Sequence, residues 1–238
     1  MKKSTSYQIF LLILFLSFWT WAAISPLFPE DWLLENYLVF IAVPVILITG
    51  IYFRLSNISY TLITLFLILH VIGSHYTYAE VPFGYILQDW FSSSRNMYDR
   101  LVHFSFGLLI AYSIREIFVR ITKAKGFWGY YLPIELTLAF SAIYELIEWL
   151  AVLAVEPEAG LAFLGAQGDV WDAQKDMALA SLGSIITMLI VFIINAVYNK
   201  SHWKELKESF HIPKNDAPLG EIKLEKMLNT SYKKVPVK

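Results

Sequence analysis

The sequence predicts an all-α, polytopic membrane protein built as a bundle of six transmembrane helices. Apolar residues make up 57 % of the 238 residues and charged residues only 16 %, with a mean hydropathy of +0.52. A soluble domain carries about 25 % charged residues. Six segments are also long and apolar enough to cross about 30 Å of hydrocarbon. Finally, lysine and arginine residues gather at one set of segment ends, as is typical of membrane helices.

The six predicted spans are bounded by polar or charged residues. They run approximately over residues 7–28, 37–53, 58–74, 100–119, 131–155 and 177–198. The third is the shortest because Arg54 and Asn57 fix its start, and we expect it to extend a little past Gly73. Residues 1–198 therefore form a six-helix membrane domain. Residues 199–238, which are rich in Lys and Glu, form a polar cytoplasmic tail that is partly helical or disordered.

The first span has an alternative reading as a signal peptide, because MKKSTSYQIFLLILFLSF begins with positive charge and is followed by WAAIS. Its apolar run of about 20 residues is longer than the 7–15 residues of a signal peptide. We therefore expect an uncleaved first span. Cleavage would leave the orientation of the other spans unchanged.

The orientation follows from the basic residues in the short loops. One set of span ends carries Lys2, Lys3, Arg54, Arg115, Arg120, Lys123 and Lys125, and the other carries Arg95, Arg100 and Lys175. Cytoplasmic loops hold the excess of Lys and Arg, so we expect the first set to be cytoplasmic. Both termini then lie on the cytoplasmic side of the membrane. Three loops, about 29–36, 75–99 and 156–176, then face outward.

Acidic residues and histidines collect at one depth, just below the outward ends of the predicted spans. The group comprises Asp99, His103, Glu145, Glu148, Asp169, Asp172 and Asp176. Its members recur at spacings of three or four, so each helix presents them on one face. Gly107, Ala180 and Gly183 lie deeper on the same faces, and small residues let helices approach closely. Because titratable side chains are costly when they face lipid, we expect this group to line an outward-facing pocket.

These residue types suit a divalent metal ion. Carboxylate oxygens with one or two imidazole nitrogens are ligands for Mg²⁺, Mn²⁺ or Zn²⁺. The expected metal ligands are Asp99, Glu145, Asp169, Asp172 and Asp176, and the expected catalytic groups are His103, as a ligand or general base, and Glu148. A metal-activated water then suits a hydrolase or transferase acting on a lipid or cell-envelope headgroup.

Composition narrows the chemistry further. The chain has no cysteine, which excludes disulfides, thiolate metal ligands and a cysteine nucleophile. Its net charge of −1 gives no general attraction to nucleic acid. Membrane lipid is therefore the expected partner, and nucleic acid is not.

Each polar feature also has a structural alternative. Asp99 can act as a helix N-terminal cap, and the spaced aspartates can be solvated or capping groups. Glu145 and Glu148 repel each other if both are charged, so we expect a proton, a cation or a salt bridge to Arg95 or Arg100 beside them.

Two further functions stay open. The first is a non-catalytic module that binds an envelope lipid or a partner protein. The second is a proton- or ion-coupled transporter, although the cytoplasmic halves of the spans hold few acids, chiefly Glu116 and Glu135. Three further polar residues, His70, His75 and Glu80, also lie near the outer surface. A histidine on an apolar helix, such as His70, is more often a core residue whose hydrogen bonds are satisfied within the protein.

Four stretches carry a family resemblance: HYTYAEVPFG, NMYDRLVHFSFG, YELIEW and LGAQGDVWDAQKDMALASLG. Together they resemble the bacterial inner-membrane proteins of the YjdF type, over about residues 40–198. That family is a domain of unknown function, so the resemblance implies topology and not a reaction. A weaker likeness is to the VanZ-like membrane proteins, associated with glycopeptide tolerance, from whose pattern Glu148 and Ala180 depart.

Overall fold

The computed structural model describes residues 2–154, 166–212, 222, 224 and 226–228, and within them it contains helices and no strand. Six helices are long and apolar enough to span a membrane, which confirms the predicted fold class. They are α1 (Lys2–Ala23), α2 (Pro29–Tyr52), α3 (Asn57–Tyr76), α5 (Tyr98–Ile117), α6 (Trp128–Ala154) and α8 (Asp172–Tyr198). Shorter elements are the 3₁₀ turn η1 (Tyr78–Glu80), α4 (Pro82–Phe91), the π-helical turn η2 (Phe118–Thr122) and α9 (His202–Glu208).

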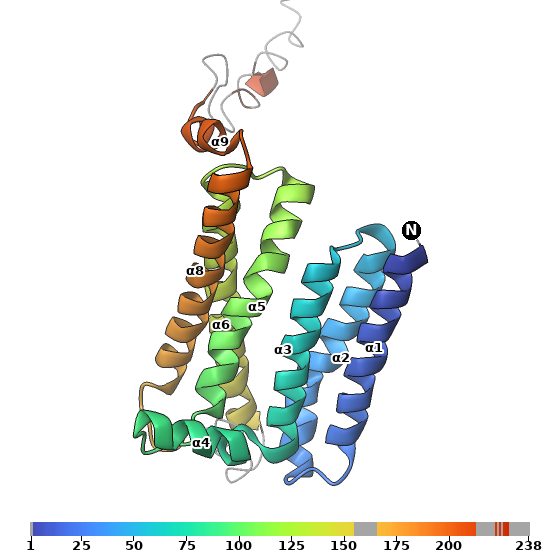
Figure 1. Cartoon of the computed structure of the whole chain (residues 1–238). Helices are drawn as coiled ribbons and strands as arrows, with labels where there is room; N and C mark the ends of the chain where they lie inside the picture. Colours follow the sequence, from blue (N-terminus) through green and yellow to red (C-terminus); the bar gives the residue numbers. More distant parts are fainter. Residues whose placement is uncertain (1, 155–165, 213–221, 223, 225, 229–238) are drawn as a thin grey trace, which may run out of the picture.

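The long helices form two groups of three, α1–α2–α3 and α5–α6–α8 (Figure 1). Helix α5 joins the groups, because it packs against α3 as well as α6 and α8. The short helix α4 lies crosswise at one end of the bundle, which we call the α4 end (Figure 1). Helix α9 and the N-terminus lie at the other end, the α9 end. Large apolar side chains such as Ile41, Leu153 and Val197 are exposed along the spans, as expected of surfaces that face lipid.

Small residues bring α5 and α8 into close contact, as the sequence predicts. A Cβ added to Gly107 of α5 would overlap the carbonyl oxygen of Ala180 and lie 2.7 Å from the backbone nitrogen of Ser184. A Cβ on Gly183 of α8 would overlap the carbonyl oxygen of Phe104. This close approach brings the polar ends of α5 and α8 together.

The structure differs from the expected loops at three places. Helix α8 begins at Asp172, within the expected loop 156–176. Residues 29–36 form the first turns of α2 and not a loop, because Pro29 stands at the first helical position and Glu30 and Asp31 follow it. The expected loop 75–99 contains α4, whose apolar residues lie on one face. The early start of α2 carries Asp31 and Glu35 into buried positions.

The expected polar tail begins with a packed segment. His202 of α9 is buried against the ring of Phe192, and the indole nitrogen of Trp128 donates a hydrogen bond to the carbonyl oxygen of Ser209 at 2.8 Å. Most of the predicted tail lies outside the described residues, as do residue 155 of the predicted fifth span and residues 156–165 of the predicted loop.

Candidate functional site

Two buried arginines hold the aspartates that open α8. Arg95 lies in the segment just before α5, separated from it by Asn96 and Met97, and Arg100 lies in the first turn of α5. One guanidinium nitrogen of Arg100 lies 2.5 Å from Asp172 Oδ1 and 3.1 Å from Asp169 Oδ2. Arg95 pairs with Asp172 as well, and Arg100 also pairs with Asp176. These ion pairs fasten the start of α5 to the start of α8.

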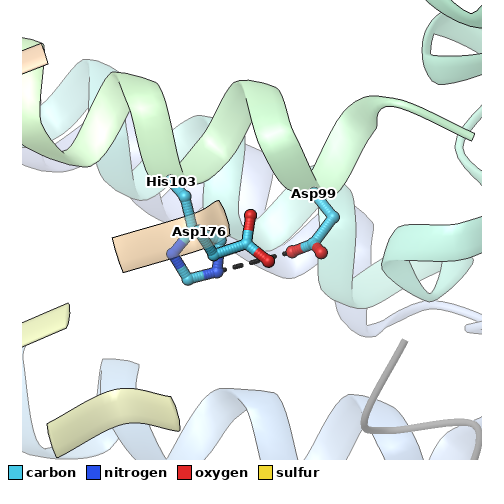
Figure 2. A group of neighbouring side chains, drawn as sticks. All are labelled: Asp99, His103 and Asp176. Atoms are coloured by element: carbon cyan, nitrogen blue, oxygen red, sulfur yellow. Dashed lines mark ion pairs between the residues drawn. The ribbon is translucent and has the colours of Figure 1, made fainter. Parts of the chain in front are cut away.

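Deeper in the bundle, three potential metal ligands converge. Asp99 and His103 project from one face of α5, and Asp176 reaches them from α8 (Figure 2). One ligand atom from each lies within 4.8 Å of the others, and all three residues are buried. The Nε2 atom of His103 lies 3.5 Å from Asp99 Oδ1. Metal–ligand bonds of about 2.0–2.6 Å place the ligand atoms of one ion at such separations.

Glu145 of α6 extends this group. Its Oε1 atom lies 3.6 Å from His103 Nε2. Among the described residues, neither this oxygen nor Asp176 Oδ1 has a hydrogen-bond partner, although both atoms are buried. Buried polar atoms in proteins are nearly always satisfied. Asp99, His103 and Asp176 therefore have the chemistry and spacing of cation ligands, and Asp176 Oδ1 has no other partner among the described residues.

The acidic groups in and around this cluster outnumber the basic groups. Glu148 is buried one turn beyond Glu145, close enough to Glu145 and Asp99 to interact electrostatically. The acidic groups here are those of Asp99, Glu145, Glu148, Asp169, Asp172 and Asp176, and the basic groups are those of Arg95, Arg100, Lys175 and His103. Acids outnumber bases even with His103 protonated. Since unbalanced charge is costly in the membrane, protons or a cation must compensate for the excess.

Asp169 differs from the deeper acids because it lies at the rim. Its carboxylate accepts a hydrogen bond from Lys175 Nζ at 2.6 Å and another from the backbone nitrogen of Trp171 at 3.1 Å. The bond from Lys175 is the main reason that the pKa of Asp169 lies below its usual value. Of the seven residues that the sequence predicts, Asp99, His103, Glu145 and Asp176 thus surround the unsatisfied oxygens. Glu148 lies beside them. Asp169 and Asp172 lie nearer the mouth, and the ion pairs of Arg95 and Arg100 reach both of them as well as Asp99 and Asp176.

Sequence reasoning missed the acids of α2. Asp31 and Glu35 are both buried, and Glu35 Oε2 accepts a hydrogen bond at 2.7 Å from the hydroxyl of Tyr144, whose ring contacts His103 edge-on. The sequence did contain a signal: Pro29 is typical of the first position of a helix, and Asp31 and Glu35 follow it four residues apart, which places both acids on one helix face. Sequence reasoning also treated Arg95 and Arg100 as an alternative partner for the glutamates, whereas they pair with aspartates.

The remaining polar candidates serve the packing of the bundle. His70 is buried, and its ring nitrogens lie 2.5 Å from the hydroxyl of Tyr78 and 3.1 Å from the carbonyl oxygen of Glu35. The ring of His75 is hydrogen-bonded to the carbonyl oxygen of Ala22. Glu80 accepts a hydrogen bond from Tyr85 of α4. His70 is therefore a satisfied core histidine, and its contact with the backbone of Glu35 helps to position α2.

Comparison with known proteins gives two matches. The model of a family described as "Predicted membrane protein (DUF2238)" matches residues 7–196. The chain is also 45 % identical over 161 residues to "Inner membrane protein YjdF" of Escherichia coli (strain K12), and the match covers 67 % of this chain and 77 % of that protein. No solved structure matches the chain significantly.

Proposed function

We propose a function from the premise that this chain belongs to the DUF2238 family of predicted membrane proteins, as its resemblance to YjdF-type proteins predicts. It is a multi-pass membrane protein with six helices able to span the bilayer. In our proposal its acid–histidine cluster holds one divalent metal ion, and the protein is a hydrolase or transferase acting on a lipid or cell-envelope headgroup. The observation that carries this proposal is the convergence of Asp99, His103 and Asp176 within 4.8 Å.

The ligand roles follow from position. Asp99 and Asp176 would hold the ion, with Glu145 adding the oxygen that has no hydrogen-bond partner among the described residues. Oxygen ligands suit Mg²⁺ and Mn²⁺, and an imidazole ligand would favour Zn²⁺. A bound divalent ion supplies an activated water and stabilises a phosphoryl or carbonyl oxygen.

The proton-transfer roles fall to His103 and Glu148. His103 either completes the ligand set or acts as the general base, because its Nε2 atom is within 3.6 Å of both Asp99 and Glu145. Glu148 is buried beside Glu145 and would carry a proton away from the cluster. Asp172 and Asp169 would contribute by holding Arg95 and Arg100 at the mouth of the site.

We further propose that the α4 end faces outward and that both termini are cytoplasmic in the inner membrane. The distribution of Lys and Arg in the loops supports this orientation. The exposed Phe83, Tyr85 and Trp90 of α4 suit the boundary between headgroups and hydrocarbon. A headgroup substrate would then reach the acid cluster from the outer surface.

The proposal is tested by elemental mass spectrometry on protein purified in mild detergent with Mg²⁺, Mn²⁺ and Zn²⁺ supplied. We expect about one metal ion per chain, lost in Asp99→Asn and Asp176→Asn while both variants remain monodisperse. Asp89→Asn, a change of an exposed acid on α4, is the matched control and retains the metal. The proposal is contradicted if wild-type protein contains no metal under these conditions. If Asp169→Asn retains the metal and Asp176→Asn loses it, the metal site comprises the deeper residues and not Asp169.

One observation favours a second function, a non-catalytic module that binds a lipid headgroup or partner. Arg95 and Arg100 already neutralise Asp169 and Asp172, as expected of a purely structural network. In that case Asp176→Asn impairs folding together with metal retention. Transport has less support, because at the α9 end Glu116 is fixed by hydrogen bonds to Ser56 and Ser59.

A further inference from the structure

A cavity of about 360 Å³ lies between α1, α2 and α3 near the α9 end, far from the acid cluster. Its walls are largely apolar and include Phe15, Val43 and Leu67. Most of its polar side chains gather at one end, where α1 and α3 begin and α2 ends; they are Thr5, Gln8, Arg54 and Tyr60. The volume is within the range of about 300–1,000 Å³ that small-molecule sites occupy. The cavity thus combines an apolar interior with a polar mouth.

Arg54 is fixed at this mouth without an acidic partner among the described residues. Its Nη2 atom donates hydrogen bonds to the side-chain oxygens of Gln8 and, at 3.3 Å, Thr5, so neutral groups orient the guanidinium. Glu116 lies at the same end and is occupied by other groups: it accepts hydrogen bonds from Ser59 and from Arg120 at 2.5 Å. The mouth of the cavity therefore carries net positive charge.

We propose that this cavity binds one phospholipid, with an acyl chain between the three helices and the phosphate on Arg54. The helices that form the cavity all have the length and hydropathy of membrane spans, so hydrocarbon is the solvent around it. An apolar interior excludes a free phosphate ion as the occupant, and a cationic mouth disfavours a neutral hydrocarbon alone. Guanidinium groups bind phosphate through charge-assisted hydrogen bonds. Because no acid neutralises Arg54 within the described structure, an anionic headgroup binds more tightly than a zwitterionic one.

The test is native mass spectrometry of the full chain after exchange into detergent containing phosphatidylglycerol or phosphatidylcholine. We expect wild type to retain one phosphatidylglycerol and to prefer it over phosphatidylcholine. Arg54→Gln weakens retention of phosphatidylglycerol by about tenfold or more, as expected for the loss of a charged hydrogen-bond donor. Gly50→Leu places a side chain in the cavity next to the hydroxyl of Tyr60 and displaces both lipids. Leucine also has a higher helix propensity than the glycine that it replaces, so we expect this variant to remain folded.

Two controls separate specific binding from general attraction. Lys125→Gln removes a positive charge at the same end but away from the cavity, and Ile48→Phe enlarges an exposed apolar side chain on the same helix as Gly50. Both should retain lipid as wild type does. The proposal is overturned if Arg54→Gln and Gly50→Leu retain phosphatidylglycerol normally, or if Lys125→Gln loses it equally. Size-exclusion profiles of each variant confirm that the protein remains folded.

Discussion

Tyr144 of α6 donates a hydrogen bond of 2.7 Å to Glu35 Oε2 of α2 and thereby joins the two groups of three helices. The ring of Tyr144 also meets the imidazole of His103 edge-on, with the ring centroids 5.9 Å apart. The acid cluster is therefore continuous from α8 through α5 and α6 to α2. Helix α2 therefore contributes to the site although it belongs to the group α1–α2–α3, and the other contributing helices belong to the group α5–α6–α8.

Replacing Tyr144 by Phe should destabilise the bundle by about 1–3 kcal/mol, because a buried carboxylate oxygen loses its hydrogen-bond donor. The measurement is the free energy of unfolding in detergent. Tyr37→Phe, at an exposed tyrosine on α2, is the control and should change stability by less than about 0.5 kcal/mol. Equal stability of Tyr144→Phe and wild type would show that the Glu35 contact does not hold the two helix groups together.

The contact between α5 and α8 gives a second prediction. In Gly107→Ala the added methyl group would overlap the backbone of Ala180, which cannot move without shifting all of α8. We expect a loss of about 2–3 kcal/mol, the upper end of the usual cost of overpacking. The matched control is Gly50→Ala, whose methyl group would lie 3.2 Å from the hydroxyl of Tyr60, a side chain that can adjust. Unfolding curves that coincide for the two variants would argue against a tight α5–α8 contact.

The small residues and the spans were predictable because both depend on local pattern. Apolar runs identify spans by length, and Gly107, Ala180 and Gly183 stand at spacings that share a helix face. Helix α4 was not predicted, since a ten-residue amphipathic segment in a loop is too short for a span. The buried position of Glu35 also depends on a tertiary contact with Tyr144, which no local pattern encodes.

Glu116 provides a third prediction, at the α9 end. It accepts hydrogen bonds from the backbone nitrogen of Ser56 at 2.9 Å and from the hydroxyl of Ser59 at 2.5 Å, so it holds the start of α3. Glu116→Ala removes these acceptors, and we expect a loss of about 2 kcal/mol, as for a helix cap. Glu135→Ala, at an exposed acid near the same end, should be nearly neutral in the same unfolding assay. A larger effect at Glu135 would contradict this assignment.

Within the candidate site, the sequence indicated the depth of the acids but not their partners. Asp169, Asp172 and Asp176 were expected to act together as ligands, whereas ion pairs with Arg95 and Arg100 engage all three, Asp176 through Arg100. Which acid pairs with which arginine depends on the rotation of α5 against α8 and on the turn before α8. Helical spacing gives the face of each helix and leaves that relative rotation undetermined.

Asp169 gives a prediction about pH. Because the bond from Lys175 lowers the pKa of Asp169, the pair contributes stability above the usual aspartate pKa of about 3.9. That contribution is lost as pH falls through the lower pKa of the folded state. Lys175→Met should therefore be less stable than wild type at pH 7, and the difference should shrink below about pH 4. A difference in unfolding free energy that is constant from pH 7 to pH 3 would contradict the assigned pair.

The orientation of the bundle can be tested without background labelling, because the chain has no cysteine. Asp89 of α4 and Lys125 after η2 are both exposed and lie at opposite ends of the spans. In spheroplasts, a membrane-impermeant maleimide should label Asp89→Cys directly and Lys125→Cys only after the membrane is permeabilised. This result follows if the Arg- and Lys-rich α9 end is cytoplasmic. The reverse pattern would place the acid cluster at the cytoplasmic surface, and any headgroup substrate would then belong to the inner leaflet or the cytoplasm.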